Sequence, residues 1–197
     1  MPTLVVPFRG AHGKSRLEPL GDEERAAVAH AMLADVAAAA ADVGRTFVVS
    51  PEPATVPART THVADPGRGQ GAAVRAALDA AVAAGSPSPY LVVNADLPCL
   101  LPADLRRLAE AVAADGIAVA AAPDGTTNAL ALASAGLFRP VYGPGSAARF
   151  ATLAASRRVD APNLIDDVDT FDDLSRLEHR VGPHTRAALA ALRAEAA

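Results

Sequence analysis

Three parts of this sequence carry residues that could bind phosphate groups or a metal ion, and the first lies near the start of the chain. Residues 8–16 contain Gly13-Lys14-Ser15, the letters that also end a P-loop. A P-loop needs another glycine five residues before the Gly-Lys pair, where this chain has Phe8, so the spacing excludes a P-loop. The loop can still bind a triphosphate through free backbone N–H groups and side-chain cations, with a solvated basic turn as the alternative. The candidates in this loop are Arg9, Gly10, Gly13, Lys14 and Arg16.

Carboxylates in two places could hold a metal ion. An apolar segment at Tyr90–Asn94 runs directly into Asp96, and open α/β sheets bind ligands beyond the carboxyl ends of their strands. Asp96 is therefore a candidate Mg²⁺ ligand, or else a turn residue that caps the next helix. Farther along, Asp166, Asp167 and Asp169 repel one another unless they are solvated or share a cation. If the late strand lies beside the Asp96 strand, one or two of these acids complete the site.

Two glycine turns form the third candidate stretch. Asp124–Asn128 places two threonine hydroxyls in a turn between two expected strands, and Tyr142–Ser146 leads into an expected helix. A serine N-cap with free backbone amides can bind an anion, and Arg149 could assist it from one turn into the helix. Ordinary turn chemistry, with a solvated arginine, is the alternative for both segments.

The segment Gly67–Ala72 matches G-x-G-x-x-A, a pattern found in dinucleotide-binding folds. Such folds place the pattern after the first strand, with an acid about 20 residues later. Here it follows the second strand, and position 91 is Leu91. We interpret it as a loop that lets a nucleotide base or ribose approach the backbone.

The composition restricts the class of protein. The 197 residues fit one domain that can bury a core. A net charge of −4 and 4% aromatic residues argue against nucleic-acid binding. Cys99 is the single cysteine, so no internal disulfide can form, and we expect it to be a small buried residue. The sequence shows neither a signal-peptide pattern nor an apolar run of membrane-spanning length, which predicts a cytoplasmic protein without membrane contact.

Apolar segments and alanine-rich segments alternate along the chain. This rhythm predicts a mostly parallel sheet with helices on both faces. Strands are expected at residues 4–8, 46–50, 90–94, 117–122, 129–133 and 159–165. Helices are expected at residues 22–42, 71–84, 102–115, from Ser146, after Thr170 (a T-x-x-D capping signal) and at 184–197.

Taken in order, these motifs resemble one family. The runs are VVPFRGAHGKSRL, GRGQGAAVRAAL, NADLP, DGTTNAL, YGPGSAARF and DDVDTFDDL. They resemble the CofC/FbiD guanylyltransferases of coenzyme F420 biosynthesis, over about Leu4–Leu174. The related nucleotidyltransferases of sugars and of the molybdenum cofactor share this plan, as would a non-catalytic nucleotide-binding protein of the same fold.

The resemblance implies a fold, a reaction and a set of roles. The fold is a three-layer α/β/α, Rossmann-like GT-A-type nucleotidyltransferase domain spanning residues 1–197. The reaction is Mg²⁺-dependent transfer of GMP from GTP to phosphoenolpyruvate or 2-phospho-L-lactate, releasing pyrophosphate. A homodimer, and hand-over of the product to the next enzyme, are compatible with it. The resemblance assigns Lys14, Arg16 and Asp96 to catalysis, and Asp96, Asp167 and Asp169 to metal binding. It assigns Asn94, Gly69 and Gly71, together with the residues of the first loop, to the nucleotide. The acceptor is assigned to Thr127, Gly143 and Ser146.

One departure from the family pattern concerns the nucleotide. The family often reads G-L-N-A-A where this chain has Gly69-Gln70-Gly71-Ala72-Ala73. A polar contact is thus missing at position 71, and this leaves the preference for guanine open. The absence of a Ser-His pair is expected, because an acceptor phosphate is already an anionic nucleophile and mainly needs alignment and charge neutralisation.

Overall fold

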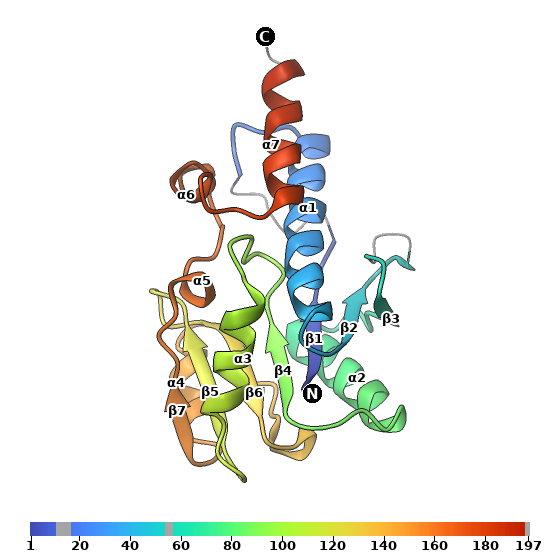
Figure 1. Ribbon diagram of the computed structural model, residues 1–197, viewed down its shortest axis with the longest axis vertical. Helices are drawn as coiled ribbons and strands as arrows, with labels where there is room; N and C mark the ends of the chain where they lie inside the picture. Colours follow the sequence, from blue (N-terminus) through green and yellow to red (C-terminus); the bar gives the residue numbers. More distant parts are fainter. Residues whose placement is uncertain (11–16, 54–56, 196–197) are drawn as a thin grey trace.

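Seven strands form one sheet in the computed structural model, which describes residues 1–10, 17–53 and 57–195. The order across the sheet is β3-β2-β1-β4-β6-β5-β7, and β6 alone runs antiparallel to both of its neighbours. The strands are β1 Thr3–Pro7, β2 Arg45–Ser50, β3 Thr60–Ala64, β4 Tyr90–Val93, β5 Ile117–Ala121, β6 Thr127–Leu132 and β7 Ser156–Arg158. Because β6 is reversed, its first residues lie at the same edge as the carboxyl ends of β1 and β4 (Figure 1).

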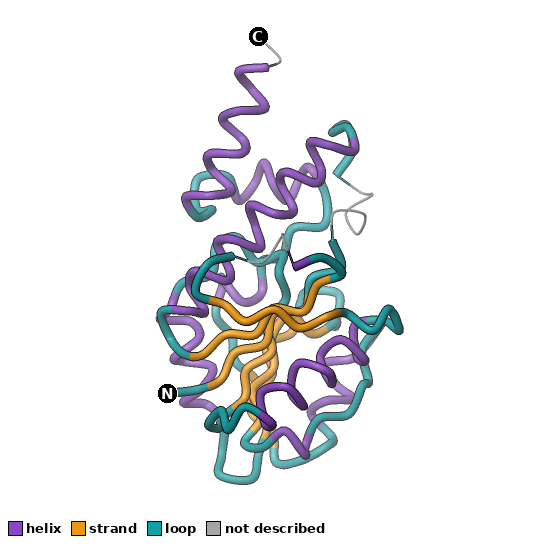
Figure 2. The backbone as a smooth tube through the Cα atoms, turned by 90° about the vertical axis from the view of Figure 1, so that its right-hand side faces the viewer, coloured by secondary structure: helices purple, strands orange, loops and turns teal. Residues whose placement is uncertain are grey.

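Helices cover both faces of the sheet, as the edge-on view in Figure 2 shows. They are α1 Asp22–Ala41, α2 Gln70–Ala83, α3 Pro102–Ala111, α4 Ser146–Ala151, α5 Pro162–Ile165, α6 Phe171–Leu177 and α7 Pro183–Glu195, with a short 3₁₀ turn at Ala135–Leu137. Helices α1, α3 and α5 contact one face, and α2 and α4 contact the other.

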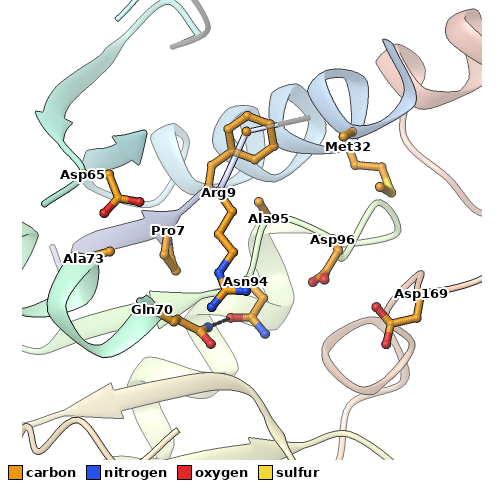
Figure 3. Close-up of a pocket in the computed structure, with 13 residues that line it drawn as sticks. Pro7, Arg9, Met32, Asp65, Gln70, Ala73, Asn94, Ala95, Asp96 and Asp169 are labelled. Atoms are coloured by element: carbon orange, nitrogen blue, oxygen red, sulfur yellow. Dashed lines mark hydrogen bonds between the residues drawn. The ribbon is translucent and has the colours of Figure 1, made fainter. Parts of the chain in front are cut away.

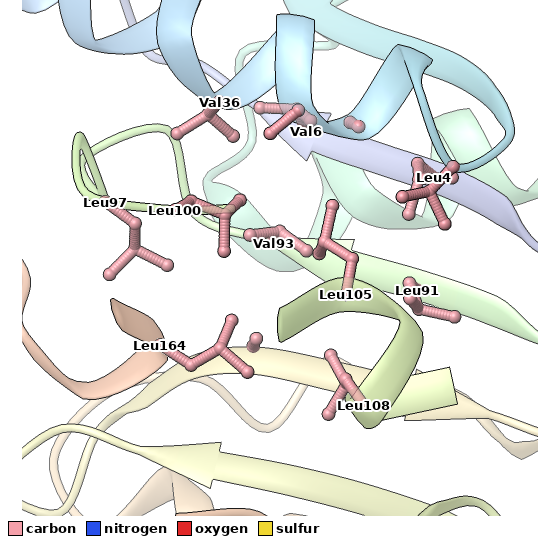
Figure 4. Packing of buried hydrophobic residues seen from close by; sticks show 14 of the residues in the cluster. Leu4, Val6, Val36, Leu91, Val93, Leu97, Leu100, Leu105, Leu108 and Leu164 are labelled. Carbon is pink, nitrogen blue, oxygen red and sulfur yellow. The ribbon is translucent and has the colours of Figure 1, made fainter. Parts of the chain in front are cut away.

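Alternate residues of the central strands fill the two cores. Leu4 and Val6 of β1 belong to the core that α1 and α3 share, whereas Val5 belongs to the core that contains α2. Figure 4 shows the first core, where Leu91 meets Leu105 and its neighbours. Burial on both faces accounts for the uninterrupted apolar runs in these strands.

A third core lies beyond the carboxyl edge of the sheet. It joins α1, α6 and α7 to the segment around Leu17, and it contains Cys99 and Val168. The cysteine is therefore buried, as expected, and burial raises the pKa of its thiol. Val168 lies between Asp167 and Asp169, so this core also fixes the acidic segment.

The predicted elements are confirmed over most of the chain, but the edges of the sheet differ. The strand β3 was not predicted, because it lies at an edge and three of its five residues are only partly buried and two are exposed. The strand expected at residues 159–165 is wrong: Pro162 begins the helix α5 instead, and β7 ends at Arg158. The helix expected over residues 102–115 ends at Ala111.

Candidate active site

Three carboxylates meet at the carboxyl edge of the sheet. Each of Asp96, Asp167 and Asp169 offers an oxygen, and these oxygens lie within 4.8 Å of one another. Asp96 follows β4, and the other two follow α5. Oxygen donors at this spacing suit a hard divalent cation.

The acidic segment reaches Asp96 by a route that differs from the one expected. The strand β7 pairs with β5 at the far edge of the sheet, so no late strand lies beside β4. Instead, the chain returns through α5, and the N–H of Val168 donates to the carbonyl of Asp96 at 3.0 Å. The side chain of Asn128 adds a bond from Nδ2 to Oδ1 of Asp167 at 3.2 Å.

The electrostatics separate the three acids of the segment. Burial, with the neighbouring Asp96 carboxylate, raises the pKa of Asp167 to about 6. Asp166 instead pairs with Arg180 at 2.8 Å and with Arg176 at 3.1 Å. Asp167 and Asp169 thus face Asp96, whereas Asp166 serves as an ion-pair partner for two arginines.

A cavity of about 260 Å³ extends from this acid cluster along the carboxyl ends of β1 and β4 (Figure 3). Asp96 and Asp169 lie at one end, and Gln70 and Asp65 lie toward the other. The side chain of Arg9 extends between the two ends. The cavity therefore offers carboxylates at one end, a cation in the middle and an amide and a further carboxylate at the other end.

Two side-chain amides join this cavity to the start of β6. Gln70 Nε2 donates to Asn94 Oδ1 at 2.8 Å, and Asn94 Nδ2 donates to the Thr127 carbonyl at 3.2 Å. A backbone carbonyl only accepts hydrogen bonds, so it fixes the orientation of the Asn94 amide and, through it, that of Gln70.

Thr127 continues the connection to the glycine loop. Its hydroxyl bonds that of Ser146 at 3.0 Å, and both residues are buried. Ser146 is the first residue of α4, and the N-cap is Gly145, so the expected serine N-cap is wrong. The loop itself turns through Gly143 and Gly145, whose φ angles are +104° and +69°.

Sequence comparison adds the family. The MobA-like NTP transferase domain matches residues 20–161. The chain belongs to the MobA-like NTP transferases. It is therefore a nucleotidyltransferase, and the sheet with its two helical layers is the α/β fold expected of one.

Curated relatives of this NTP transferase agree. A phosphoenolpyruvate guanylyltransferase of Streptomyces scabiei is 38% identical over 96% of both chains. The enzyme of the same name from Rubrobacter xylanophilus is 35% identical over 92% of this chain and 96% of its own. A 2-phospho-L-lactate guanylyltransferase of Natrialba magadii is 38% identical over 64% of this chain and 60% of its own.

Solved structures show the same fold at low identity. A Desulfovibrio desulfuricans protein, described as a candidate nucleotide-diphospho-sugar transferase, superposes with a TM-score of 0.78 at 16% identity, over 98% of this chain and 96% of its own. A Mycobacterium tuberculosis protein solved with manganese gives a TM-score of 0.58 at 21% identity, over 91% and 98%.

The structure places most of the predicted site residues of this NTP transferase. Arg9, Gly10, Asn94, Asp96 and Asp169 line the cavity, and Asp167 joins the acid cluster. Gly13, Lys14 and Arg16 lie outside the described residues.

Two glycines at the start of α2 lie apart from that cavity: Gly69 is its N-cap and Gly71 its second residue. Gly69 and Gly71 line a shallow hollow on the outer side of α2. A Cβ on Gly71 would lie 2.5 Å from Pro140 Cβ, so this glycine allows the helix to approach that proline. Between them, Gln70 reaches the cavity.

Three contributors were not predicted. Gln70 and Asp65 line the cavity, and Asn128 holds Asp167. Gln70 lies in a segment that we interpreted through its glycines, and Asp65 follows β3, the strand that the sequence pattern did not predict.

Proposed function

We propose that this protein transfers GMP from GTP to phosphoenolpyruvate, forming enolpyruvoyl-2-diphospho-5′-guanosine and pyrophosphate in coenzyme F420 biosynthesis. The main observation that supports this proposal is the acid cluster of Asp96, Asp167 and Asp169 at one end of a cavity that Arg9 also lines. The relatives of similar length act on phosphoenolpyruvate. We propose residues 1–197 as a single cytoplasmic nucleotidyltransferase domain, acting on small molecules and not on nucleic acid.

We assign the nucleotide to the cavity and the acceptor to the neighbouring glycine loop. With the α-phosphate near the acid cluster, the nucleoside extends toward Gln70 and Asp65, and the phosphates extend toward Arg9 and Gly10. The acceptor binds at the Thr127, Gly143 and Ser146 side, which the Asn94 amide joins to the nucleotide cavity. Its phosphate oxygen attacks the α-phosphorus, and pyrophosphate leaves.

The chain's own residues align the reactants and neutralise charge. Arg9, with Lys14 and Arg16 of the first loop, stabilises the negative charge that develops on pyrophosphate. The acceptor phosphate is already ionised, so no general base is required. Alignment by the amides and hydroxyls of the site contributes the remaining part of the barrier reduction.

The donor set fits Mg²⁺. Three carboxylates within 4.8 Å repel one another without a cation, and the burial of Asp167 adds to that cost. Asp96, Asp167 and Asp169 would hold the ion, which neutralises phosphate charge when bound.

The deciding experiment is a turnover matrix of nucleotides against acceptors. Purified protein with Mg²⁺ is given GTP, ATP or CTP together with phosphoenolpyruvate, 2-phospho-L-lactate or a sugar 1-phosphate. We expect pyrophosphate release and the matching product mass with GTP and phosphoenolpyruvate. Turnover with a sugar phosphate or molybdopterin only would contradict the proposal, and nucleotide binding without any turnover would indicate a binding protein. Adding the next enzyme of the pathway draws a labile product forward.

Lys14 gives a sharper test because it is the only lysine of the chain. We expect Lys14→Ala to lower kcat by at least about 100-fold, which is the loss of one phosphate-neutralising cation. The far-ultraviolet circular dichroism should match that of the wild type. Retention of most of the activity would remove this loop from the mechanism.

A further inference from the structure

The guanidinium of Arg149 binds the loop that precedes its own helix. Nε and Nη2 donate to the Val141 carbonyl at 3.1 and 3.0 Å, and Nη2 also donates to Tyr142 at 3.1 Å. Nη1 donates to the Pro144 carbonyl at 2.6 Å. Arginine holds its five donors in a planar fork. These four bonds therefore draw three carbonyls of the loop toward one point.

The N–H groups of the same loop remain available to a ligand. Among the residues that the structure describes, the backbone N–H groups of Tyr142, Gly143 and Gly145 donate to no other group. Tyr142 and Gly143 supply two consecutive N–H groups, whereas Pro144 separates Gly143 from Gly145 and has no N–H. Gly143 and Gly145 have positive φ angles, and N–H groups in such left-handed turns form concave anion sites. A cation on the carbonyl side of the loop adds to the attraction for an anion.

Two contacts fix this loop to the rest of the site. The hydroxyl of Ser146 bonds that of Thr127 at 3.0 Å. The N–H of Ala147 donates to the Gly125 carbonyl at 3.2 Å, in the turn that precedes β6. The loop is thus attached at its end to the residues that we assign to the acceptor.

We propose that Arg149 is the positioning residue of the acceptor site. Its guanidinium holds residues 141–145 in the conformation in which the N–H groups of Gly143 and Gly145 bind the anionic group of the acceptor. Four of the five guanidinium donors bind backbone carbonyls, so we assign Arg149 a role through the loop and not a direct contact with the acceptor. This inference rests on the proposed function, which assigns the acceptor to this loop.

The test compares Arg149→Ala and Arg149→Lys with the wild type in GTP and phosphoenolpyruvate kinetics. We expect KM for phosphoenolpyruvate to rise at least 10-fold in both variants, with KM for GTP within 2-fold. Lysine keeps the charge but cannot hold three carbonyls at once. Methylguanidinium, added to Arg149→Ala, should restore part of the acceptor affinity. Calorimetric binding of phosphoenolpyruvate gives the same comparison without turnover.

Arg139→Ala is the matched control. Arg139 is also exposed, and it also donates to two backbone carbonyls, those of Gly136 and Phe138, at 2.8 Å each. Those carbonyls lie outside the acceptor loop, so its KM values should stay within 2-fold of the wild type.

The possible results separate the two proposals. If the wild type transfers GMP and the Arg149 variants keep the wild-type KM for phosphoenolpyruvate, the proposed role of Arg149 is wrong. Full recovery in Arg149→Lys would also contradict this role, because it indicates a direct charge contact. An equal rise in KM for both substrates would contradict it too, because it indicates general disruption. A wild-type protein that neither binds nor converts phosphoenolpyruvate overturns the proposed function itself.

Discussion

Gln70 is the only glutamine of the chain, and its side chain lines the cavity that we propose for the nucleotide, at a position where the family pattern has an apolar residue. The neighbouring position 71 cannot carry the usual amide, because Pro140 lies where a Cβ would be. The amide is thus present, but one residue earlier. This arrangement argues that the polar contact to the nucleotide has moved from position 71 to position 70.

We therefore expect Gln70→Leu to raise KM for GTP by about tenfold, the loss of roughly one buried hydrogen bond. The change removes the bond to Asn94 as well, so a smaller rise in KM for phosphoenolpyruvate is expected. Initial-rate kinetics with each substrate varied give the two values. Arg68→Ala is the control, because Arg68 is exposed, lies two residues before Gln70 and does not line the cavity. An unchanged KM for GTP would exclude Gln70 from nucleotide binding.

Burial should make the thiol of Cys99 unreactive. Its thiol lies in the core between α1, α6 and α7, and burial raises its pKa. The thiolate is the reactive species, so a raised pKa and lack of access both slow its reaction. At pH 8 we expect a thiol reagent to label the folded protein at least about 100-fold more slowly than the urea-unfolded chain. Complete labelling of the folded protein within seconds would show that this core opens readily.

At the level of elements, the terminal helix α7 depends on one buried acid of α1. The carboxylate of Asp35 accepts hydrogen bonds from the N–H groups of His184 at 3.0 Å and Thr185 at 2.9 Å. These N–H groups belong to the first turn of α7. The N–H groups of a first turn have no acceptor within their own helix. Gly182 makes the approach feasible, because a Cβ there would lie 2.4 Å from the Asp35 carboxylate.

We expect Asp35→Ala to lower the free energy of unfolding by about 3 kcal/mol, since one buried and one partly buried N–H group lose their partner. Urea denaturation followed by circular dichroism measures it. Asp79→Ala is the control, because the Asp79 side chain is 67% exposed and its contact with Arg75 is a surface ion pair; a change below about 0.5 kcal/mol is expected there. Equal effects of the two changes would mean that α7 does not need Asp35.

The same elements show what the sequence could and could not predict. The central strands and long helices follow from their apolar periodicity, because both faces of these strands are buried. The edge strands β3 and β7 lack that pattern: β7 has three exposed residues. Asp96 was predictable as a strand-end acid, and its acidic partners were predictable as a cluster. The route through α5 was not, because it depends on tertiary contacts such as the bond from Val168 to Asp96.

Contacts between side chains and backbone were the least predictable part of the site. Nothing in the order of residues shows that Arg149 turns back to Val141, or that Gln70 meets Asn94. Such bonds depend on the conformation of loops, which periodicity does not report.

None of the helices in the described ranges has the length and apolar character of a membrane span.

Considered as a whole, the molecule gathers three carboxylates at one end of its cavity and holds them with the sheet and the third core. The sheet supplies Asp96, the third core fixes the Asp167 and Asp169 segment, and the cavity opens between them. Electrostatic repulsion within the cluster costs stability in the absence of a cation. Binding of a cation to the folded state alone returns stability by mass action.

This balance predicts opposite effects of one substitution on stability and activity. Without divalent metal, we expect Asp96→Asn to raise the free energy of unfolding by about 1 kcal/mol, because one of the three close charges is removed. The same variant should lose at least about 1,000-fold in kcat and should no longer gain thermal stability on addition of Mg²⁺. Thermal unfolding without Mg²⁺ and with Mg²⁺ added in 10-fold concentration steps measures the stability. Pyrophosphate release measures the activity.

Asp166→Asn is the matched control, since it neutralises an acid of the same segment that pairs with Arg176 and Arg180. That variant should be less stable than the wild type, because two arginines lose their partner, yet it should keep the stabilisation by Mg²⁺. If Asp166→Asn lost the Mg²⁺ response and Asp96→Asn kept it, the metal would bind at a different set of acids. The contrast between the two variants therefore tests the position of the cation independently of the identity of the acceptor.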